Sequence, residues 1–593
     1  MCGICGELRI DGAAADLTAV NAMLPEIARR GPDAYGTWQE GAAAFGHRRL
    51  AIIDLSDRSA QPMVDERLGL VLVFNGGIYN YPELRAELIR AGYEFFSDGD
   101  TEVILKAYAH WGEACVERLH GMFAFALWDR TRRHLFLARD RMGIKPLYYA
   151  HTPGQFRFAS NVQALLAAGD VDTAIDPVGL HHQLTLHAVI PAPHTILQGV
   201  RKLAPGHCMR IDAEGRSEAR CYWQLSAMRP PQPRSKAEWI DAVHDALREA
   251  VRKRLMIADV KVGVLLSGGL DSSLLVALLA EAGVEDLMTF SIGFEDIADE
   301  RGSEFEFSDQ IVTRYGTRHH KIHIANEQVL ERLPEAIDSM SEPMVGQDAV
   351  AFYLLAERVA REIKVVQSGQ GADEVFGGYF WYPQMHEDTH GPPETRFGRY
   401  YFDRPHAEYL EAVVPAYHGE DHTAVLVAER LGRPGADEFI DQVLRFDVTT
   451  LVVDDPVKRV DNMTMAWGLE ARVPFLDHHL VELAAAMPPE LKLSSGGKHV
   501  LKRIARGLLP DAIIDRPKGY FPMPALKYVR GEFLDFMASI LTSEACRRRG
   551  LFQRAYVDKL LAAPEKHFTA LRGSKLWHLA LLELWLQRNV DRH

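Results

Sequence analysis

The sequence of 593 residues predicts an α+β domain followed by an α/β domain whose C-terminal part is helical. Three observations support this division. The first 160 residues or so mix short strand-like runs with helical patterns, the stretch from about 260 to 370 alternates strands with helices, and the chain from about 400 onward reads as mainly helical. Alternating strands and helices are typical of a parallel, doubly wound sheet. A chain of this length also exceeds what one hydrophobic core organises.

The first domain contains strand-like runs that are separated by turn signals and interrupted by helical patterns. We expect strands at 70–74, 123–128 and 134–138, helices at 81–91 and 101–111, and an antiparallel hairpin within 200–222. A Pro-rich stretch, MRPPQPRSK at 228–236, then breaks the pattern. We therefore assign residues 1–227 to the first domain, 228–240 to a linker and 241–593 to the second domain.

The second domain begins with apolar runs that alternate with helical patterns. We expect strands at 261–266, 287–294, 320–324 and 364–367, and helices at 272–282 and 350–362. In parallel sheets of this kind, ligands bind beyond the carboxyl ends of the strands. The residues that follow these strands are therefore the first place to look for chemistry.

The composition excludes several classes of protein. A formal net charge of −14 argues against a nucleic-acid partner, because binding phosphates requires a surplus of Lys and Arg. The six cysteines form no CxxC pair and no zinc-like pattern, which indicates reduced thiols. We find no signal peptide and no apolar run of about 18 residues, so we expect a cytoplasmic protein without a membrane partner. A homodimer is compatible with the sequence.

Cys2 is a candidate nucleophile, because removal of Met1 would leave it with a free α-amino group. An α-amino group has a pKa of about 7.7–8 and can serve as the base for its own thiol. The alternative is that the chain begins Met-Cys-Gly by chance. The ordered series Arg30-Gly31-Pro32-Asp33, Gly46-His47-Arg48-Arg49-Leu50, Phe74-Asn75-Gly76 and Gly99-Asp100-Thr101-Glu102 favours the functional interpretation.

A phosphate-binding loop is predicted where the apolar run 261–266 ends, at Ser267-Gly268-Gly269-Leu270-Asp271-Ser272-Ser273. Glycines let the backbone approach phosphates, and a helix N-terminus favours anions. The loop is not a Walker A motif, because GxxxxGK[ST] is absent. Ser368-Gly369-Gln370-Gly371-Ala372-Asp373-Glu374 follows another strand, so Asp271 and Asp373 can share Mg²⁺. Acids at a helix N-terminus are the alternative interpretation.

The motifs around Cys2 resemble the class II, N-terminal nucleophile glutaminase domain of asparagine synthetases, which implies an αββα sandwich. By this resemblance Cys2 attacks the side-chain amide of glutamine. Asn75 and the backbone N–H of Gly76 form the oxyanion hole, Arg49 holds the substrate carboxylate, and Asp100 holds its ammonium. Asn75 and Gly76 thus contact glutamine as well. The sequence has Gly77 where the family commonly has Glu after Asn-Gly.

The second domain resembles the ATP pyrophosphatase domain of the same family. The resemblance implies ATP and Mg²⁺ as cofactors and a catalytic role for Lys518 in Arg516-Pro517-Lys518, where a lysine would neutralise charge on the leaving pyrophosphate. It also implies an ATP site that is made of Leu265, Ser267, Gly268, Gly269, Asp271, Ser272, Ile292, Ser368 and Gly369. Asp271 and Asp373 would be the metal ligands.

Two departures from the family pattern concern the acceptor. Gln370 replaces an acidic residue that helps to deprotonate ammonia, and Gly346, beside Gln347, replaces another acid. Segments such as SGQGADE and RPKGYFPMP resemble the N-acetylglutaminylglutamine amidotransferase branch. The resemblance implies that glutamine, ATP and a small carboxylate acceptor, an acetylated dipeptide, are the partners. The alternatives are asparagine synthesis from aspartate, a bare glutaminase, and a non-catalytic regulatory paralogue.

Overall fold

The structure is a computed structural model that describes residues 2–296, 302–516 and 529–592. Its N-terminal part contains two six-stranded antiparallel sheets. The first sheet has the order β10 (Arg201–Lys202), β8 (Tyr148–Thr152), β9 (Gln155–Ala159), β1 (Cys2–Arg9), β3 (Ala43–Arg49) and β2 (Ala34–Glu40). The second has the order β12 (Ser217–Cys221), β11 (His207–Asp212), β7 (His134–Arg139), β6 (Gly121–Asp129), β5 (Leu70–Ile78) and β4 (Met63–Asp65).

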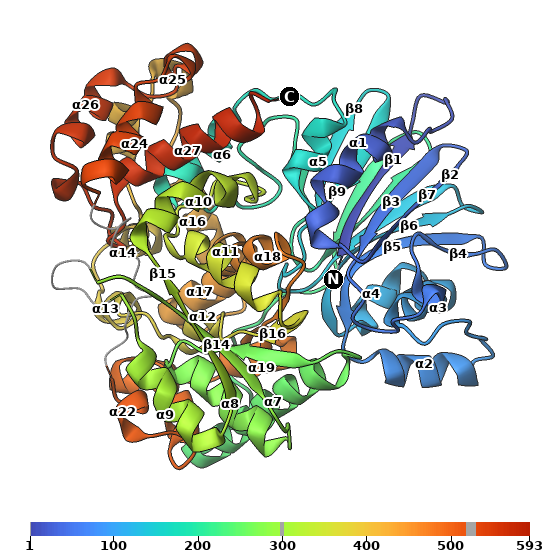
Figure 1. Cartoon of the computed structure of the whole chain (residues 1–593), viewed down its shortest axis with the longest axis horizontal. Helices are drawn as coiled ribbons and strands as arrows, with labels where there is room; N and C mark the ends of the chain where they lie inside the picture. Colours follow the sequence, from blue (N-terminus) through green and yellow to red (C-terminus); the bar gives the residue numbers. More distant parts are fainter. Residues whose placement is uncertain (1, 297–301, 517–528, 593) are drawn as a thin grey trace.

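The two sheets stack face to face and have helices on their outer faces (Figure 1). Between them lies an apolar layer that includes Ile4, Phe45 and Val73, all completely buried. Helices α1 and α5 cover the first sheet, and α3 covers the second. This arrangement confirms the predicted αββα sandwich. The helices of this part are α1 (Thr18–Glu26), α2 (Tyr81–Arg90), α3 (Asp100–Trp111), α4 (Cys115–Arg118), α5 (Val162–Ala167) and α6 (Pro177–Thr185).

A five-stranded parallel sheet forms the centre of the second part. Its order is β15 (Arg318–Ile324), β14 (Met288–Phe294), β13 (Val262–Leu265), β16 (Val365–Gln367) and β17 (Glu470–Arg472). The chain runs outward from β13 to β15 and then returns to β16 on the other side of β13. Such a reversal opens a crevice at the carboxyl ends of the two neighbouring strands. Both predicted ATP-site loops follow these strands, β13 and β16.

Helices surround this sheet and extend into the C-terminal part, as predicted (Figure 1). Those near the sheet are α7 (Lys236–Met256), α8 (Leu270–Glu281), α9 (Phe305–Tyr315), α10 (Asn326–Asp338), α11 (Asp348–Val359) and α12 (Ala372–Phe376). Those that follow are α13 (Trp381–Glu387), α14 (Pro393–Tyr401), α15 (His406–Ala412), α16 (His422–Leu431), α17 (Phe439–Phe446), α18 (Lys458–Met465), α19 (His478–Ala485), α20 (Pro489–Leu493), α21 (His499–Ala505), α22 (Asp511–Ile514), α24 (Gly531–Leu541), α25 (Glu544–Arg549), α26 (Arg554–Ala562) and α27 (Lys575–Asn589).

Two wide π-helical turns connect α17 to α18. They span Asp447–Leu451 and Val453–Val457. Turns of this kind are rare and are frequently found at functional sites. Helix α18 itself packs against α11, beside the parallel sheet.

The structure differs from the sequence predictions at two elements. Helix α7 begins at Lys236, inside the predicted 228–240 linker, because Ser235 and Glu238 form a capping box. Strand β17 was not predicted at all. Its sequence, Glu470-Ala471-Arg472, is polar, and it becomes a buried strand because the Glu470 carboxylate accepts a hydrogen bond from Arg472 Nε.

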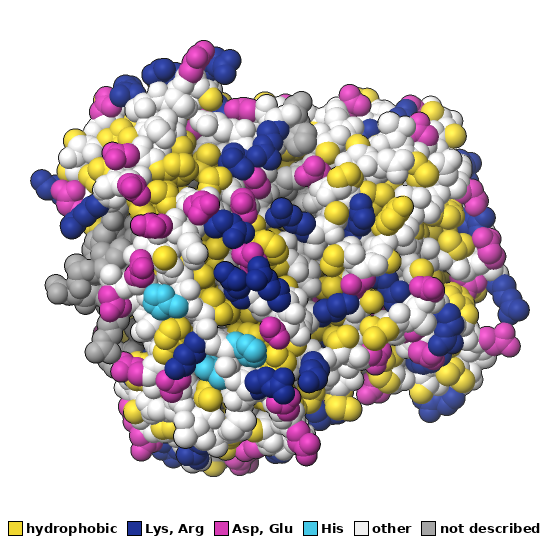
Figure 2. All heavy atoms as spheres, in the orientation of Figure 1, with side chains coloured by type: hydrophobic (Ala, Val, Ile, Leu, Met, Phe, Trp, Pro, Cys, Tyr) yellow, Lys and Arg dark blue, Asp and Glu magenta, His cyan; other side chains and the backbone are white. Residues whose placement is uncertain are grey.

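Three further observations concern the surface, the cysteines and the length of the helices. Lys and Arg side chains are interspersed with Asp and Glu over the face shown in Figure 2. The six cysteines are free thiols. None of the helices within the described residues is long and apolar enough to cross a membrane.

Candidate active sites

Cys2 begins β1, one of the two middle strands of the first sheet, and the N-terminus of the chain lies where the two parts of the molecule meet (Figure 1). Its side chain is buried, with 6% exposure for the residue. The backbone N–H of Cys2 donates to Asn75 Oδ1 across 3.0 Å. The Asn75 Nδ2 group is buried and has no hydrogen-bond partner among the described residues. This amide can therefore donate to a ligand oxygen beside the thiol.

The other predicted glutamine contacts gather around the same thiol. Arg49 is paired with Cys2 in the strand register of β1 and β3. Its guanidinium donates to the carbonyl oxygens of Asp54 and Ser56, which fixes its orientation. Asp100 begins α3, and its Oδ2 accepts a hydrogen bond from Ile78 N at 2.9 Å. Burial raises the pKa of Asp100 to about 7.

Gly76 and Gly77 lie near the end of strand β5 and differ in the space around them. A Cβ at Gly76 would lie 2.1 Å from the carbonyl oxygen of Met122, so no larger residue fits without backbone movement. At Gly77 a Cβ would meet only Ile257 Cδ1, at 3.4 Å, which is ordinary contact. The family's usual Glu would therefore meet an isoleucine side chain from the second part of the chain.

A second site occupies a cavity of about 980 Å³ at the carboxyl ends of the parallel strands. The predicted residues Leu265, Ser267, Gly269, Asp271, Ser272, Ile292, Ser368, Gly369, Gln370, Gly346, Gln347 and Asp373 all line it. Gly268 does not line the cavity. It has a left-handed φ of +76°, and a Cβ there would lie 2.6 Å from Ser308 N, so its role is to form the turn.

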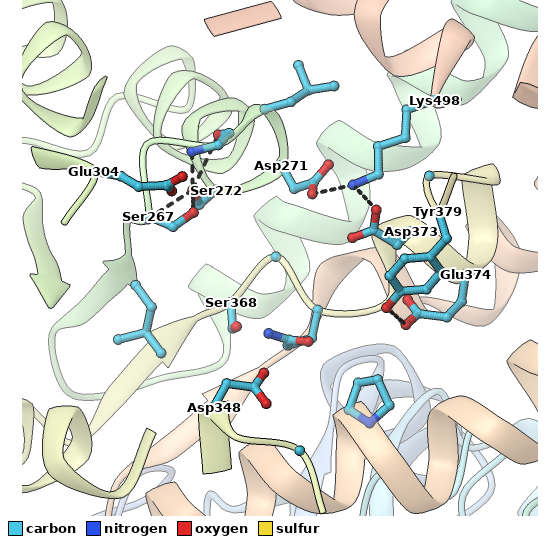
Figure 3. A pocket seen from close by; sticks show the side chains of 18 of the residues that line it. Ser267, Asp271, Ser272, Glu304, Asp348, Ser368, Asp373, Glu374, Tyr379 and Lys498 are labelled. Atoms are coloured by element: carbon cyan, nitrogen blue, oxygen red, sulfur yellow. Dashed lines mark hydrogen bonds and ion pairs between the residues drawn. The ribbon is translucent and has the colours of Figure 1, made fainter. Parts of the chain in front are cut away.

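The loop after β13 is held by its own serines. Ser272 Oγ accepts from Ser267 N at 3.2 Å and lies 3.1 Å from Ser267 Oγ, and Ser267 Oγ accepts from Gly269 N at 3.3 Å (Figure 3). Gly269 caps helix α8 without a side-chain partner. The first N–H groups of α8 therefore face the cavity, where anions are favoured.

Asp271 and Asp373 approach a single cation, the ammonium group of Lys498. Lys498 Nζ lies 2.5 Å from Asp271 Oδ2 and 2.7 Å from Asp373 Oδ1 (Figure 3). Although burial opposes it, the two carboxylates raise the pKa of Lys498. The pair thus presents oxygen donors to one positive charge at the end of two neighbouring strands. Oxygen donors of this kind also suit Mg²⁺.

Gly346 and Arg459 form one wall of the cavity, called the Gly346 wall below. A Cβ at Gly346 would lie 2.3 Å from Arg459 Nη1. The guanidinium therefore occupies the space that a side chain at 346 would need. Arg459 pairs with Asp348, at 3.1 Å, and with Asp455.

The other acids of this wall are also paired. Tyr379 OH donates to Glu374 Oε1 at 2.6 Å, and Tyr382 OH donates to Asp447. Burial and the neighbouring Glu374 raise the pKa of Asp447 well above its usual range. Each of the four acids described at this wall therefore already has an ion-pair or hydrogen-bond partner within the protein.

Sequence reasoning missed Lys498 and Arg459. Lys498 follows Gly496-Gly497 and has a left-handed φ of +54°, so the paired glycines were its only local signal. Arg459 belongs to helix α18 and is recognised only through its contacts. Arg516 lines the cavity and pairs with Glu304 at 2.9 Å. The predicted catalytic Lys518 lies outside the described residues.

Fold and sites together define a glutamine amidotransferase domain joined to a nucleotide-binding α/β domain. Comparison with known families agrees with this class. The family described as "Glutamine amidotransferase domain" matches residues 1–223, and the family described as "Asparagine synthase" matches residues 242–587. The chain belongs to the asparagine synthase family and is accordingly a carbon–nitrogen ligase.

Curated relatives match along the whole chain. Asparagine synthetase [glutamine-hydrolyzing] 1 of Bacillus subtilis is 30% identical over 100% of this chain and 97% of that protein. A putative asparagine synthetase of Mycobacterium tuberculosis is 33% identical over 99% of this chain and 97% of that protein. Amidase chry2 of Gibberella zeae is also 30% identical, over 85% of each chain. Relatives of comparable identity therefore have different names.

Proposed function

We propose that this enzyme transfers the amide nitrogen of glutamine to a carboxylate acceptor at the expense of ATP. In the first half-reaction, Cys2 attacks the side-chain amide of glutamine, ammonia leaves, and water clears the thioester. The unpartnered Asn75 Nδ2 and the N–H of Gly76 would stabilise the tetrahedral oxyanion. Arg49, paired with Cys2 in the strand register, and the buried Asp100 suit the substrate carboxylate and ammonium.

The second half-reaction takes place in the cavity beyond β13 and β16. The N-terminus of α8 and the loop Ser267–Ser272 would hold the phosphates of ATP, with Leu265 and Ile292 against the nucleoside. Asp271 and Asp373 would hold Mg²⁺, which neutralises charge on the triphosphate when bound. Lys498 would orient both carboxylates. The acceptor carboxylate attacks the α-phosphorus, pyrophosphate leaves, and ammonia then displaces AMP from the acyl-adenylate.

The acceptor that the cavity wall supports best is the C-terminal carboxylate of N-acetylglutaminylglutamine. The observation that carries this proposal is the position of Arg459 in the space beside Gly346. Aspartate brings a free ammonium, and the described acids of this wall are already paired with Arg459, Tyr379 or Tyr382. Gln370 can donate and accept hydrogen bonds, which suits an acceptor that has amide groups.

Acceptor profiling tests this proposal. The enzyme is incubated with glutamine, Mg-ATP and either N-acetylglutaminylglutamine or aspartate, and AMP and pyrophosphate are measured. We expect kcat/KM to be far higher for the blocked dipeptide. A higher kcat/KM for aspartate would identify the enzyme as an asparagine synthetase. Glutamate release without any AMP would identify a bare glutaminase, and no turnover at either site would identify a regulatory paralogue.

A further inference from the structure

Two histidines share one carboxylate on the wall of the large cavity. His187 Nδ1 lies 3.1 Å from Asp403 Oδ2 and 3.2 Å from Asp403 Oδ1. His578 Nδ1 lies 3.2 Å from Asp403 Oδ2. Asp403 and His578 are almost completely buried, and both His187 and His578 line the cavity. Because Nδ1 of His187 faces Asp403, Nε2 is the nitrogen that remains available to a ligand.

The fold constrains this group from several sides. The Asp403 backbone N–H donates to the Thr185 carbonyl at 3.0 Å. Arg404, which is completely buried, donates to the carbonyls of Leu184, at 3.0 Å, and Lys575, at 2.9 Å. These bonds join the chain segments that carry His187, Asp403 and His578.

The backbone at His187 is strained. His187 and Ala188 have left-handed φ values of +54° and +59°. Residues other than glycine rarely adopt this conformation, because the Cβ atom approaches the following carbonyl oxygen too closely. The surrounding contacts therefore hold His187 in a conformation that the chain would not adopt by itself.

His187 lines the same cavity as Gly346 and Arg459. The charges that act on it, besides Asp403, are those of Asp455 and Arg459, and His187 in turn acts on Asp348. Arg459, Asp348 and Gly346 form the wall described above, and Gln370 lines the same cavity. Although burial opposes it, Asp403 raises the pKa of His187 to about 8.

We propose that His187 is the catalytic base that takes a proton from the attacking ammonia, with Asp403 as its positioning residue. This inference rests on the proposed function. The ammonia nitrogen forms a bond to the acyl carbon, the bond from that carbon to the AMP oxygen breaks, and AMP leaves with the electron pair. One N–H proton passes to His187 Nε2 and then to solvent. Asp403 holds Nδ1–H and stabilises the resulting imidazolium, as carboxylates do behind catalytic histidines.

This assignment accounts for the amide at position 370. Gln370 cannot accept a proton, so the reaction needs another base beside the acyl-adenylate. Within the described part of this wall, Asp348 and Asp455 are paired with Arg459, and Glu374 and Asp447 accept hydrogen bonds from Tyr379 and Tyr382. His187 combines an available nitrogen with a carboxylate behind it.

The test separates adenylate formation from nitrogen transfer in the full-length enzyme. His187→Asn keeps a short polar residue that tolerates the left-handed backbone. We expect acceptor-dependent exchange of pyrophosphate into ATP to stay within about threefold of wild type. Ammonia-dependent amide formation should fall about 10²–10⁴-fold, the usual contribution of a general base. His390→Asn, at an exposed histidine, is the matched control.

Two further measurements distinguish a catalytic role from a structural one. Hydroxylamine, a nucleophile that is largely unprotonated at neutral pH, should form hydroxamate with much less loss in His187→Asn. His187→Gly accommodates the backbone and leaves room for added imidazole, which should restore amide formation. Parallel loss of pyrophosphate exchange and of both nucleophile reactions would assign a structural role. Unchanged amide formation would also overturn the proposal.

Two controls keep the conclusions separate. If wild-type exchange requires aspartate instead of the dipeptide, the proposed acceptor is wrong, and the His187 variants are tested with aspartate. The ligand atoms of His187, Asp403 and His578 all lie within 4.8 Å of one another. A stoichiometric transition metal on the purified enzyme that is lost in His578→Ala would identify a metal site and overturn the catalytic assignment.

Discussion

Arg30 and Asp461 form a buried ion pair that connects the two active sites. Arg30 Nη2 lies 3.0 Å from Asp461 Oδ2, and Arg30 Nε donates to the carbonyl of Cys2 at 3.2 Å. Asp461 belongs to α18, the helix that also carries Arg459 of the Gly346 wall. Lys145 Nζ lies 2.9 Å from the second oxygen of the same carboxylate. One short helix therefore contacts both the nucleophile strand and the synthetase cavity.

Replacing Asp461 by Asn should destabilise the contact between the domains. Arg30 and Lys145 would remain buried without their countercharge, which costs roughly 3–5 kcal/mol. We expect the melting temperature to fall by several degrees, and glutamate release per amide formed to rise as the sites uncouple. Asp535→Asn, on the exposed face of α24, is the control. Unchanged stability and an unchanged ratio would show that the pair has no such role.

Replacing Cys2 by Ala should abolish glutamine-dependent synthesis and leave ammonia-dependent synthesis close to wild type. The reason is that the thiol and the ATP loop belong to different sheets. Amide formation is measured with each nitrogen donor. Equal loss of both activities in a folded variant would contradict the two-site model.

Asp271→Asn and Asp373→Asn should each reduce acceptor-dependent pyrophosphate release by several orders of magnitude. Each change removes one of the two charges that face the shared cation position at Lys498. Hydrolysis of glutamine should continue, and Asp535→Asn again serves as the control. Pyrophosphate release near the wild-type rate from either variant would show that the metal binds elsewhere.

Binding of glutamine should weaken in acid because of Asp100. Burial raises its pKa to about 7, so the carboxylate is charged above that pH and becomes neutral below it. The kcat/KM for glutamine hydrolysis, which reports the free enzyme, should fall about a hundredfold per pH unit well below pH 7, because the α-amino base of Cys2 becomes protonated in the same range. In Asp100→Asn the kcat/KM should be low, and it should fall only about tenfold per pH unit. An acid limb equally steep in the wild type and in Asp100→Asn would show that Asp100 does not bind the substrate ammonium.

Gly346→Ala should impair acceptor use. The new methyl would displace the Arg459 guanidinium, 2.3 Å away, from Asp348 and Asp455. We expect the KM for the acceptor to rise at least about tenfold, whereas hydrolysis of glutamine stays unchanged, since the affected contacts lie in the synthetase cavity. Gly419→Ala is the matched control, because a Cβ there meets nothing closer than 3.6 Å. If Gly346→Ala had the same KM for the acceptor as Gly419→Ala, the Gly346 wall would not contribute to acceptor binding.

The parts of the molecule that local sequence determines were predictable. The apolar strand β13 followed by Ser267-Gly268-Gly269 predicts a turn and a helix N-terminus, and the structure has both. Contacts between distant segments were not predictable. Arg459 beside Gly346, and His187 beside Asp403, depend on how the C-terminal helices pack. Strand β17 escaped detection because two charged residues satisfy each other inside the protein.

The two π-helical turns before α18 determine how the preceding helical segment is rotated relative to α18. In an ordinary α-helix each residue advances about 100° around the axis. Deleting one residue between Asp447 and Val457 would therefore rotate the preceding segment by about that angle relative to α18. Helix α18 would keep its place, since Asp461 and Asn462 are bonded to Arg30 and to Ser341. An engineer could in this way present a new set of side chains to the acceptor without redesigning the junction between the domains.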